Sequence, residues 1–511
     1  MSLPLLFSGR MSPGYGISRW FAAACLVVSS HGLPQDGERW IEFSRKDAEM
    51  DPYVQEAQAW SRTHFGTAKL GDKRRTERLI LLATQVASDP SGSFPEQTES
   101  WNDLRAAYNL FDCDEVTFEA IATPHWKLTR KTNEKRLLLI EDTTEIDYGP
   151  KRKIKGSSPV GTGLGCGFHL HSALMVATES DRVHGLAGQL IYHRQPVSKE
   201  ETRTQRLQRA DRESQIWGKL VNLIGSPPSG ISWVHVADRG SDDFEFFFHC
   251  QQTKTEWVAR AKNLNRVIIT PTGREQPLKP YLQTLPEAGR YTLTLRARPN
   301  QPARTAKLVV SFGALTMPTP KLKSPFLKRV NPAPIPMAVV WVRELDPPEG
   351  VGPIEWVLYT SLPVETFDDA MVIVGYYEKR WLIEEWHKTL KTGLRVEKRQ
   401  LKDSERLEPM MGLMSVVAVR LFQLKGEART APERPAEEVV PPRYVMGLKA
   451  VRKLGALTTL TVGRFFRELA MLGGFIGRRR DGDPGWITIW RGWDRLQDMI
   501  RGADAIMEFK I

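Results

Sequence analysis

Two aspartates lie at the ends of predicted strands, and the first of these strands is a wholly apolar run. Asp142 comes after the run 137–140 and Glu141, and Asp238 comes directly after the run 231–237. A short, wholly apolar run indicates a strand covered on both faces, and the carboxyl ends of such strands are where α/β folds receive their ligands. Aspartate also commonly begins the turn after a strand. Each aspartate alone is therefore open to a structural reading, and the pair becomes a candidate acidic site.

A third carboxylate lies on the segment 366–392, which is predicted to form one long helix. The residues that share a stripe with it are Tyr377, Arg380, Glu384, Lys388 and Lys391. At about 100° per residue these five fall within a stripe roughly 80° wide. One acid among several cations suits a carboxylate that binds a metal ion while its neighbours hold phosphates. An ordinary salt-bridged helix face remains the alternative.

Three carboxylates, two from strands and one from a helix, offer the all-oxygen ligand set that Mg²⁺ prefers. Two such ions about 3.5–4 Å apart can activate water or a 3′-hydroxyl and stabilise the leaving oxygen when a phosphodiester is displaced. No competing site stands out in the sequence. The glycine-rich run 161–167 lacks the lysine of a phosphate-binding loop. His169 and His171, two residues apart on a predicted strand, are interpreted as structural or substrate-facing.

The composition favours a globular binder of polyanions. The 511 residues include 72 Lys and Arg against 60 Asp and Glu, a formal charge of +12. That excess suits nucleic acid, although a merely basic protein would share it. No apolar run is long enough to span a membrane. The four cysteines are far apart along the chain, which argues against a zinc ribbon or a disulfide scaffold and fits a reducing cytoplasm.

The elements that would position these side chains form an α/β arrangement. Helices are predicted within 54–87 and 99–129, and Asp72 is predicted to cap a helix at 73–87 that has one basic and one apolar face. Further strands are predicted at 168–178, 182–193, 256–261 and 354–361, and further helices at 199–224 and 242–252. The segment 266–350 holds many prolines and alternating stretches, which predict a β-rich insertion. Residues 1–49 are predicted to be a disordered leader or a mis-assigned start.

Several motifs occur in a fixed order along the chain after residue 54. They are Leu70–Leu79 (LGDKRRTERL), Ile140–Thr144 (IEDTT), Ala237–Arg239 (ADR), Trp257–Lys262 (WVARAK), Glu355–Thr360 (EWVLYT), Arg380–Lys388 (RWLIEEWHK), Lys391–Gly393 (KTG) and Leu472–Phe475 (LGGF). With the Tyr377, Arg380, Glu384 and Lys391 spacing, these motifs resemble bacterial insertion-sequence transposases of the DDE class that carry a Tyr-Arg-Glu-Lys signature. The run 397–400 departs from that family in the order of its basic residues.

The resemblance implies a fold and a set of domains. The fold is α/β, with a ribonuclease-H-like catalytic core, an inserted β-rich subdomain, and all-α domains at both ends. The implied ranges are a leader at 1–49, an all-α domain that binds DNA ends at 50–130, the catalytic domain at 131–424 with its insertion at about 266–350, a linker at 425–443, and a helical dimerisation region at 444–511. The C-terminal tryptophan stripe, which includes Trp486, Trp490 and Trp493, is equally well explained as an internal core.

The resemblance also implies roles for individual residues. Asp142, Asp238 and Glu384 would be the catalytic, metal-binding triad, with Mg²⁺ as the ion and Mn²⁺ as a substitute. The residues that would contact DNA are Arg74, Arg75, Arg78, Arg260, Lys262, Trp356, Tyr377, Arg380, Lys388 and Lys391. Of these, Trp356 would stack on a base flipped out of the duplex, although a tryptophan in an alternating strand more often belongs to a core.

The function that these expectations describe is cut-and-paste DNA transposition by a cytoplasmic homodimer. The enzyme would bind terminal inverted repeats in double-stranded DNA, cleave through a hairpin, and transfer 3′ ends to target DNA. No membrane partner is expected. Three alternatives stay open: a catalytically inactive or regulatory relative that only binds DNA, a general nuclease of the same fold, and a structural basic protein.

Overall fold

A computed structural model describes residues 52–90, 92–195, 200–209, 211–295, 303–438, 440, 442–478 and 482–509. The predicted leader at 1–49 lies outside these residues. The chain divides into two compact units. The first contains Thr129–Lys153 and Ser157–Glu385, and the second contains the helices before Thr129, Ile154–Gly156 and the chain from Trp386 onward. These units are not consecutive in sequence, and the predicted domain boundaries remain predictions.

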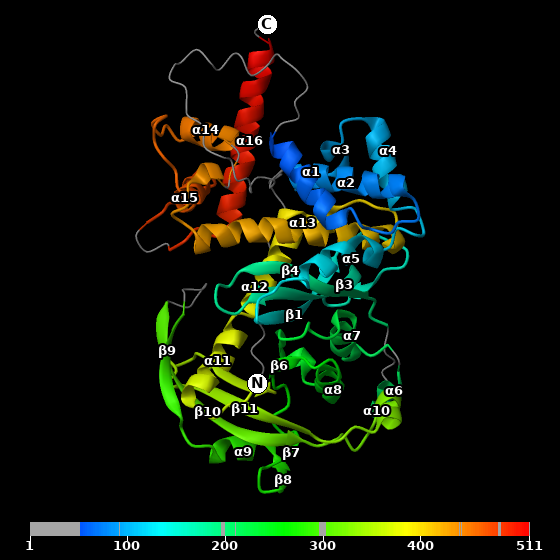
Figure 1. Ribbon diagram of the computed structural model, residues 1–511, viewed down its shortest axis with the longest axis vertical. Coiled ribbons are helices and arrows are strands. Elements are labelled where there is room, and N and C mark those ends of the chain that lie inside the picture. Colours follow the sequence, from blue (N-terminus) through cyan, green and yellow to red (C-terminus); the bar gives the residue numbers. More distant parts are fainter. Residues whose placement is uncertain are drawn as a thin grey trace. The chain divides into compact units, whose positions relative to one another are not determined.

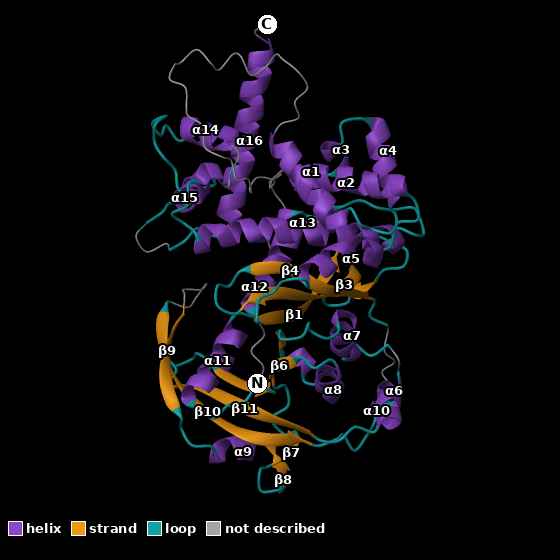
Figure 2. Cartoon of the chain, in the orientation of Figure 1, coloured by secondary structure: helices purple, strands orange, loops and turns teal. Residues whose placement is uncertain are grey.

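The first unit is built on one twelve-stranded mixed sheet, drawn in orange in Figure 2. Its strands are β1 Arg136–Asp147, β2 Ser158–Val160, β3 Gly165–Ala177, β4 Val183–Tyr192, β5 Ser232–Ala237, β6 Glu256–Arg260, β7 Val267–Ile269, β8 Glu275–Pro277, β9 Gly289–Leu295, β10 Arg304–Met317, β11 Ile335–Leu345 and β12 Glu355–Thr360. Hydrogen-bonded neighbours run in the order β2-β3-β1-β5-β6-β12-β11-β10-β7-β8, while β4 pairs with β3 and β9 with β10.

The middle of this sheet is its parallel part. Strand β5 is parallel to both β1 and β6, whereas β3 is antiparallel to β1 and to β4. A mixed α/β unit of this kind is compatible with the predicted ribonuclease-H-like core. Beyond β6, the strands β12, β11 and β10 continue the sheet in antiparallel pairs, and the segment 266–350 is strand-rich as its alternating pattern predicts.

Helices cover the sheet of the first unit. They are α6 Arg203–Gln208, α7 Gln215–Ile224, α8 Phe244–Gln252, α9 Leu278–Thr284, α10 Pro325–Val330, α11 Phe367–Glu378 and the start of α12 Trp381–Lys388. Helices α7 and α8 lie side by side (Figure 1), and α7 packs its apolar face on β3 and β4. The prediction of one helix at 199–224 is wrong. Arg212, between α6 and α7, is held by an ion pair of 2.7 Å with Glu245 of α8.

The described elements of the second unit are helices joined by loops, shown in purple in Figure 2. They are α1 Pro52–Phe65, α2 Lys73–Ser88, α3 Phe94–Gln97, α4 Trp101–Leu110, α5 Phe118–Thr129, α13 Ser404–Thr430, α14 Pro442–Val451, α15 Val462–Leu472 and α16 Trp486–Phe509. The predicted cap of α2 is confirmed, because the Asp72 side chain accepts a hydrogen bond of 2.8 Å from the Arg74 amide. Helix α13 continues through Thr430, so the first part of the segment predicted as a linker at 425–443 is helical.

Close helix contacts in the second unit depend on glycine. A Cβ at Gly473 would lie 1.8 Å from the Thr488 carbonyl oxygen, and one at Gly492 would lie 1.7 Å from that of Leu469. The α15–α16 contact therefore tolerates no side chain at either position. Trp493 of α16 is fully buried, with its ring 5.1 Å from that of Tyr444. This part of the tryptophan stripe is core, while the side chains of Trp486 and Trp490 lie outside the described residues.

Candidate active site

Three charged residues follow the last common register of the parallel strands β1, β5 and β6. That register pairs Glu141 with Ala237, and Ala237 with Ala259. The next residue on each strand is Asp142, Asp238 and Arg260, respectively. Because adjacent strands lie about 4.8 Å apart and residues in register share a face, the two aspartates and the arginine form a row along the carboxyl edge.

Strand β1 differs from its prediction at this edge. The sequence predicts that the strand ends before Asp142, but β1 continues to Asp147 because β3 pairs with it as far as Gly167. The edge exists because β5 stops opposite Glu141. Asp142 therefore lies within a continuous strand, with a strand neighbour on one side only, and its side chain is 18% exposed.

Asp238 begins the short 3₁₀ turn that follows β5. Its carboxylate oxygen Oδ1 accepts a hydrogen bond of 2.7 Å from the Gly240 amide. A Cβ at Gly240 would lie 2.8 Å from the ring of Trp217. The turn is tight because glycine lets the backbone approach α7, and this contact fixes the chain where the second aspartate leaves the strand.

Arg380 connects the first aspartate to the helical glutamate. Its guanidinium lies 3.4 Å from Asp142 Oδ2 and forms an ion pair with Glu384 one turn further on. The predicted long helix at 366–392 is interrupted between α11 and α12. At the interruption, Lys379 is paired with Asp181 at 2.6 Å.

The pKa of Asp142 reflects how close it lies to the other charged residues of the site. Burial, together with the negative charge of Asp238 and a smaller contribution from Glu384, raises the pKa of the Asp142 carboxyl to about 7. The guanidinium of Arg380 acts in the opposite direction. Burial would lower the pKa of Arg380, but the charges of Glu384 and Asp142 hold it above its ordinary value. The three predicted carboxylates thus belong to one electrostatic cluster.

The donor chemistry of this cluster fits a divalent ion of the Mg²⁺ type, since all three side chains offer carboxylate oxygens. A cation would also relieve the mutual repulsion that raises the pKa of Asp142. Within the described ranges, however, no three potential ligands are close enough to hold an ion as they stand, and both Asp142 and Glu384 are turned to Arg380. Their role as metal ligands stays a prediction.

Two predicted DNA-contacting aromatic residues touch each other beside this edge. The ring centroids of Trp356 on β12 and Tyr377 on α11 are 5.6 Å apart in an edge-to-face arrangement. Tyr377 is buried, whereas Trp356 is partly exposed. Arg260 donates a hydrogen bond of 2.8 Å to the carbonyl oxygen of Glu355, next to this tryptophan. The arginine of the edge row and the aromatic pair are therefore neighbours.

Arg239 is a candidate that the sequence reasoning did not select. It follows Asp238 directly, is exposed, and is lowered in pKa by partial burial and by the nearby charge of Arg260. The Ala-Asp-Arg motif itself was the available signal. Lys262 is also exposed, and its backbone amide donates a hydrogen bond of 2.7 Å to Asp242. Among the described residues, neither Arg239 nor Arg260 has a carboxylate ion pair.

The three predicted DNA-binding arginines of α2 are placed differently. Arg78 pairs with Asp103 of α4 at 2.9 Å and its side chain is 15% exposed. Arg75 pairs with Glu115 at 2.8 Å, and its guanidinium also donates to the Leu70 carbonyl oxygen. Arg74, 92% exposed, pairs with the capping Asp72 at 2.8 Å. The helix has the predicted basic residues, but each of the three also binds an acid of the same unit.

Lys388 and Lys391 belong to the second unit. Lys388 ends α12 and is exposed. Lys391 lies in the π-helical turn that follows, and its ammonium is 3.2 Å from Glu397. Their contact with phosphates stays a prediction.

Two family models match the chain. Residues 57–116 match a model described as transposase DNA-binding, and residues 233–419 match one described as transposase DDE domain. The first range contains the arginines of α2, and the second contains Asp238 and Glu384, whereas Asp142 lies before it. The chain therefore carries a DNA-binding domain and a DDE domain of transposases, which support a DNA transposase, an enzyme that acts on DNA. None of the helices in the described part of the chain has the length and apolar character to cross a bilayer.

Proposed function

We propose that this chain is a cut-and-paste DNA transposase, similar to the transposase of transposon Tn-five. It binds the terminal inverted repeats of its element, cleaves through a hairpin, and joins the freed 3′ ends to target DNA. The observation that carries the proposal is the row of Asp142 and Asp238 at the edge of the parallel strands, tied to Glu384 through Arg380.

The three carboxylates would hold Mg²⁺, which Mn²⁺ would replace. When bound, the metal supplies Lewis-acid stabilisation of the reacting phosphate and activation of the attacking oxygen. Arg380, which lies beside Asp142 and Glu384, would bind a phosphate oxygen, because a guanidinium offers a planar pair of donors to phosphate. Arg239 and Arg260 hold the strand beside the scissile bond.

Trp356 receives a flipped base in this scheme. Its ring is partly exposed and lies edge to face with the ring of Tyr377, with the centroids 5.6 Å apart. Base stacking of roughly 1–3 kcal/mol offsets part of the cost of flipping. A displaced base relaxes the strand end that must turn back to form a hairpin.

A homodimer that pairs two transposon ends is the proposed working form, in the cytoplasm of a bacterial cell. The support is an apolar surface on the C-terminal half of α16, where Met499, Ile506 and Met507 are 47%, 61% and 50% exposed. Apolar side chains at such exposure favour burial against a partner.

The proposal is tested with a supercoiled plasmid that carries the DNA flanking the gene. Asp142→Asn and Glu384→Gln should retain binding to the inverted repeats but lose nicking in Mg²⁺ or Mn²⁺, and a chelator should stop the wild type. Glu385→Gln is the matched control, because it makes the same chemical change one residue away and should cleave normally.

The same assay separates the alternatives. Binding without cleavage by the wild type in either metal would identify a regulatory, inactive relative. Equal cleavage of a plasmid without the flanking DNA would identify a general nuclease. Retained nicking by Asp142→Asn would remove that residue from the active site.

A further inference from the structure

A buried polar network lies on the face of β1 opposite Asp142. Side chains alternate along a strand, so Glu141 and Thr143 point away from the carboxylate edge and toward α7. Glu141, His171 of β3 and His235 of β5 are all fully buried. None of them is among the predicted site residues, and an apolar strand interior offers no reason for a carboxylate there.

Glu141 is held between the two histidines. One carboxylate oxygen pairs with His235 Nδ1, and the other lies 3.4 Å from His171 Nε2. The carboxylate therefore bonds to the ring of His235 and faces that of His171.

Thr143 connects this network to the active site. His171 Nδ1 is hydrogen-bonded to the Thr143 hydroxyl at 2.8 Å, and the Thr143 amide donates a hydrogen bond of 2.8 Å to Asp142 Oδ1. Thr143 lies beyond the end of β5, where β1 has lost one strand neighbour. Its side-chain bond to His171 fixes the backbone at the point where sheet pairing no longer does.

Trp217 of α7 supports both aspartates from the same side. Its ring centroid is 4.4 Å from that of His171, and it also lies against Gly240 in the turn that holds Asp238. The network therefore reaches the two acidic residues through one packed layer.

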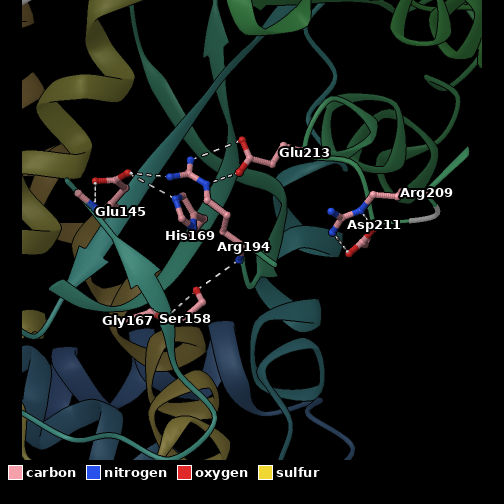
Figure 3. A network of polar contacts seen from close by, with 9 residues as sticks. Glu145, Ser158, Gly167, His169, Arg194, Arg209, Asp211 and Glu213 are labelled. Atoms are coloured by element: carbon pink, nitrogen blue, oxygen red, sulfur yellow. Dashed lines mark hydrogen bonds and ion pairs between the residues drawn. The ribbon is translucent and has the colours of Figure 1, made fainter. Parts of the chain in front are cut away.

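A second polar cluster lies next to this network. Tyr192 of β4 stacks on His169, with ring centroids 4.8 Å apart. Figure 3 shows His169 beside Glu145, which lies 3.4 Å away, and Arg194 between Glu145 and Glu213. This cluster lies further along β1 and β3, on the same face of the sheet as Thr143.

A buried charged cluster is a poor source of stability, because desolvation offsets its Coulomb attraction and apolar replacements are often as stable. Polar groups behind a metal ligand have a known use in orienting that ligand. We propose that Glu141, His171 and Thr143 are positioning residues that hold the Asp142 carboxylate in the orientation required for DNA cleavage. This inference rests on the proposed function.

Thr143→Val is the decisive variant, since valine keeps the branched shape and removes only the hydroxyl. Thr143→Ser is the matched control that restores it. His171→Phe keeps a ring against Trp217 and removes both polar contacts. Each protein is assayed, as the full chain, for Mn²⁺ affinity by electron paramagnetic resonance, for nicking of the flanking-DNA plasmid across Mn²⁺ concentrations, and for its thermal midpoint.

Thr143→Val and His171→Phe should weaken Mn²⁺ binding and slow nicking by about 10- to 100-fold, whereas Thr143→Ser should behave as the wild type. Wild-type Mn²⁺ affinity and nicking in Thr143→Val would overturn the inference. So would losses that follow the thermal midpoint across all variants, because they would mark a purely structural role.

The proposed function is judged separately. If the wild type nicks and Asp142→Asn does not, while Thr143→Val equals the wild type, only the inference fails. A wild type that neither binds Mn²⁺ nor nicks would overturn both. If His171→Phe does not fold, Thr143→Val still decides.

Discussion

The basic residues of α2 and those of the strand edge have opposite surroundings. In the second unit, Arg75 and Arg78 bind Glu115 and Asp103. In the first unit, Arg239 and Arg260 lie close enough to repel each other, and among the described residues neither has a carboxylate partner. The arginines of α2 are paired with acids of the fold. Arg239 and Arg260 make no ion pair among the described residues and are therefore available to bind an anion.

This difference shows that the net charge of the chain does not tell which cations are available to bind DNA. A formal charge of +12 describes the whole chain, but a cation that already binds an acid must give up that partner before it binds a phosphate. Cations that make no ion pair within the fold gain most from a phosphodiester. We therefore expect the strand edge to contribute more affinity per arginine than α2.

The largest expected effect concerns Arg380, a cation that is bound to the acids of the candidate site itself. Arg380→Met should raise the pKa of Asp142 further, because the guanidinium that lowers it is gone, and should reduce nicking on the order of 10²- to 10³-fold. Single-turnover nicking rates test this. Lys379→Met is the control, and an equal loss in both variants would contradict a specific role.

The next effect concerns the unpaired arginines. Arg239→Gln and Arg260→Gln should each weaken DNA binding on the order of tenfold and flatten the dependence of log affinity on log salt by about one unit of slope. Filter binding at several salt concentrations measures both quantities. An unchanged salt slope would show that these cations do not contact phosphate.

A smaller effect should separate two arginines on α2. Arg78→Met leaves Asp103 without its partner and should lower the free energy of unfolding by about 1–3 kcal/mol, with the salt slope of DNA binding nearly unchanged. Arg74→Gln should do the reverse, because its side chain is 92% exposed. Denaturant unfolding and salt titration of DNA binding test both variants. Equal changes in stability and in salt slope for the two variants would contradict the proposed difference between Arg74 and Arg78.

The smallest effect near neutral pH comes from a histidine pair in the second unit. The Nδ1 atoms of His64 and His125 are 2.9 Å apart, and burial, with a further contribution from Arg420, lowers the pKa of His64 to about 4. The unfolded chain therefore binds protons more readily below about pH 6.5. Stability should be intact above that pH and fall toward pH 4.

Thermal midpoints between pH 7 and 5 measure this loss. His64→Phe should have a flatter profile than the wild type, because it removes one of the two buried bases. A wild-type profile as flat as that of the variant would contradict the assignment.

Local patterns predicted much of the fold. The cap at Asp72, the buried strands β3 and β5 and the strand-rich segment 266–350 follow from residue types and spacing. Three predictions fail where tertiary contacts override the local pattern. Arg212, between two helices, is paired with Glu245; Lys379, where the long helix is interrupted, is paired with Asp181; and β1 continues past Asp142 because β3 pairs with it.

The candidate site is predictable to a different extent. Asp142, Asp238 and Glu384 could be selected by their positions at strand ends and on a charged stripe, although their role as ligands stays a prediction. The acids that bind Arg75 and Arg78 could not be assigned, since Glu115 and Asp103 are 40 and 25 residues away in sequence. The network around Glu141 was also missed, because register alone brings His171 and His235 to it.

The shared register of β1, β5 and β6 also affects how preparations of this protein should be judged. If β5 paired one residue out of step, Asp238 and its neighbours would exchange faces of the sheet, yet secondary-structure content would hardly change. Such a misfolded population would pass a circular dichroism assay and contribute no cleavage. The active fraction of a sample is therefore better determined by titrating the sites that cleave DNA than by measuring the concentration of soluble protein.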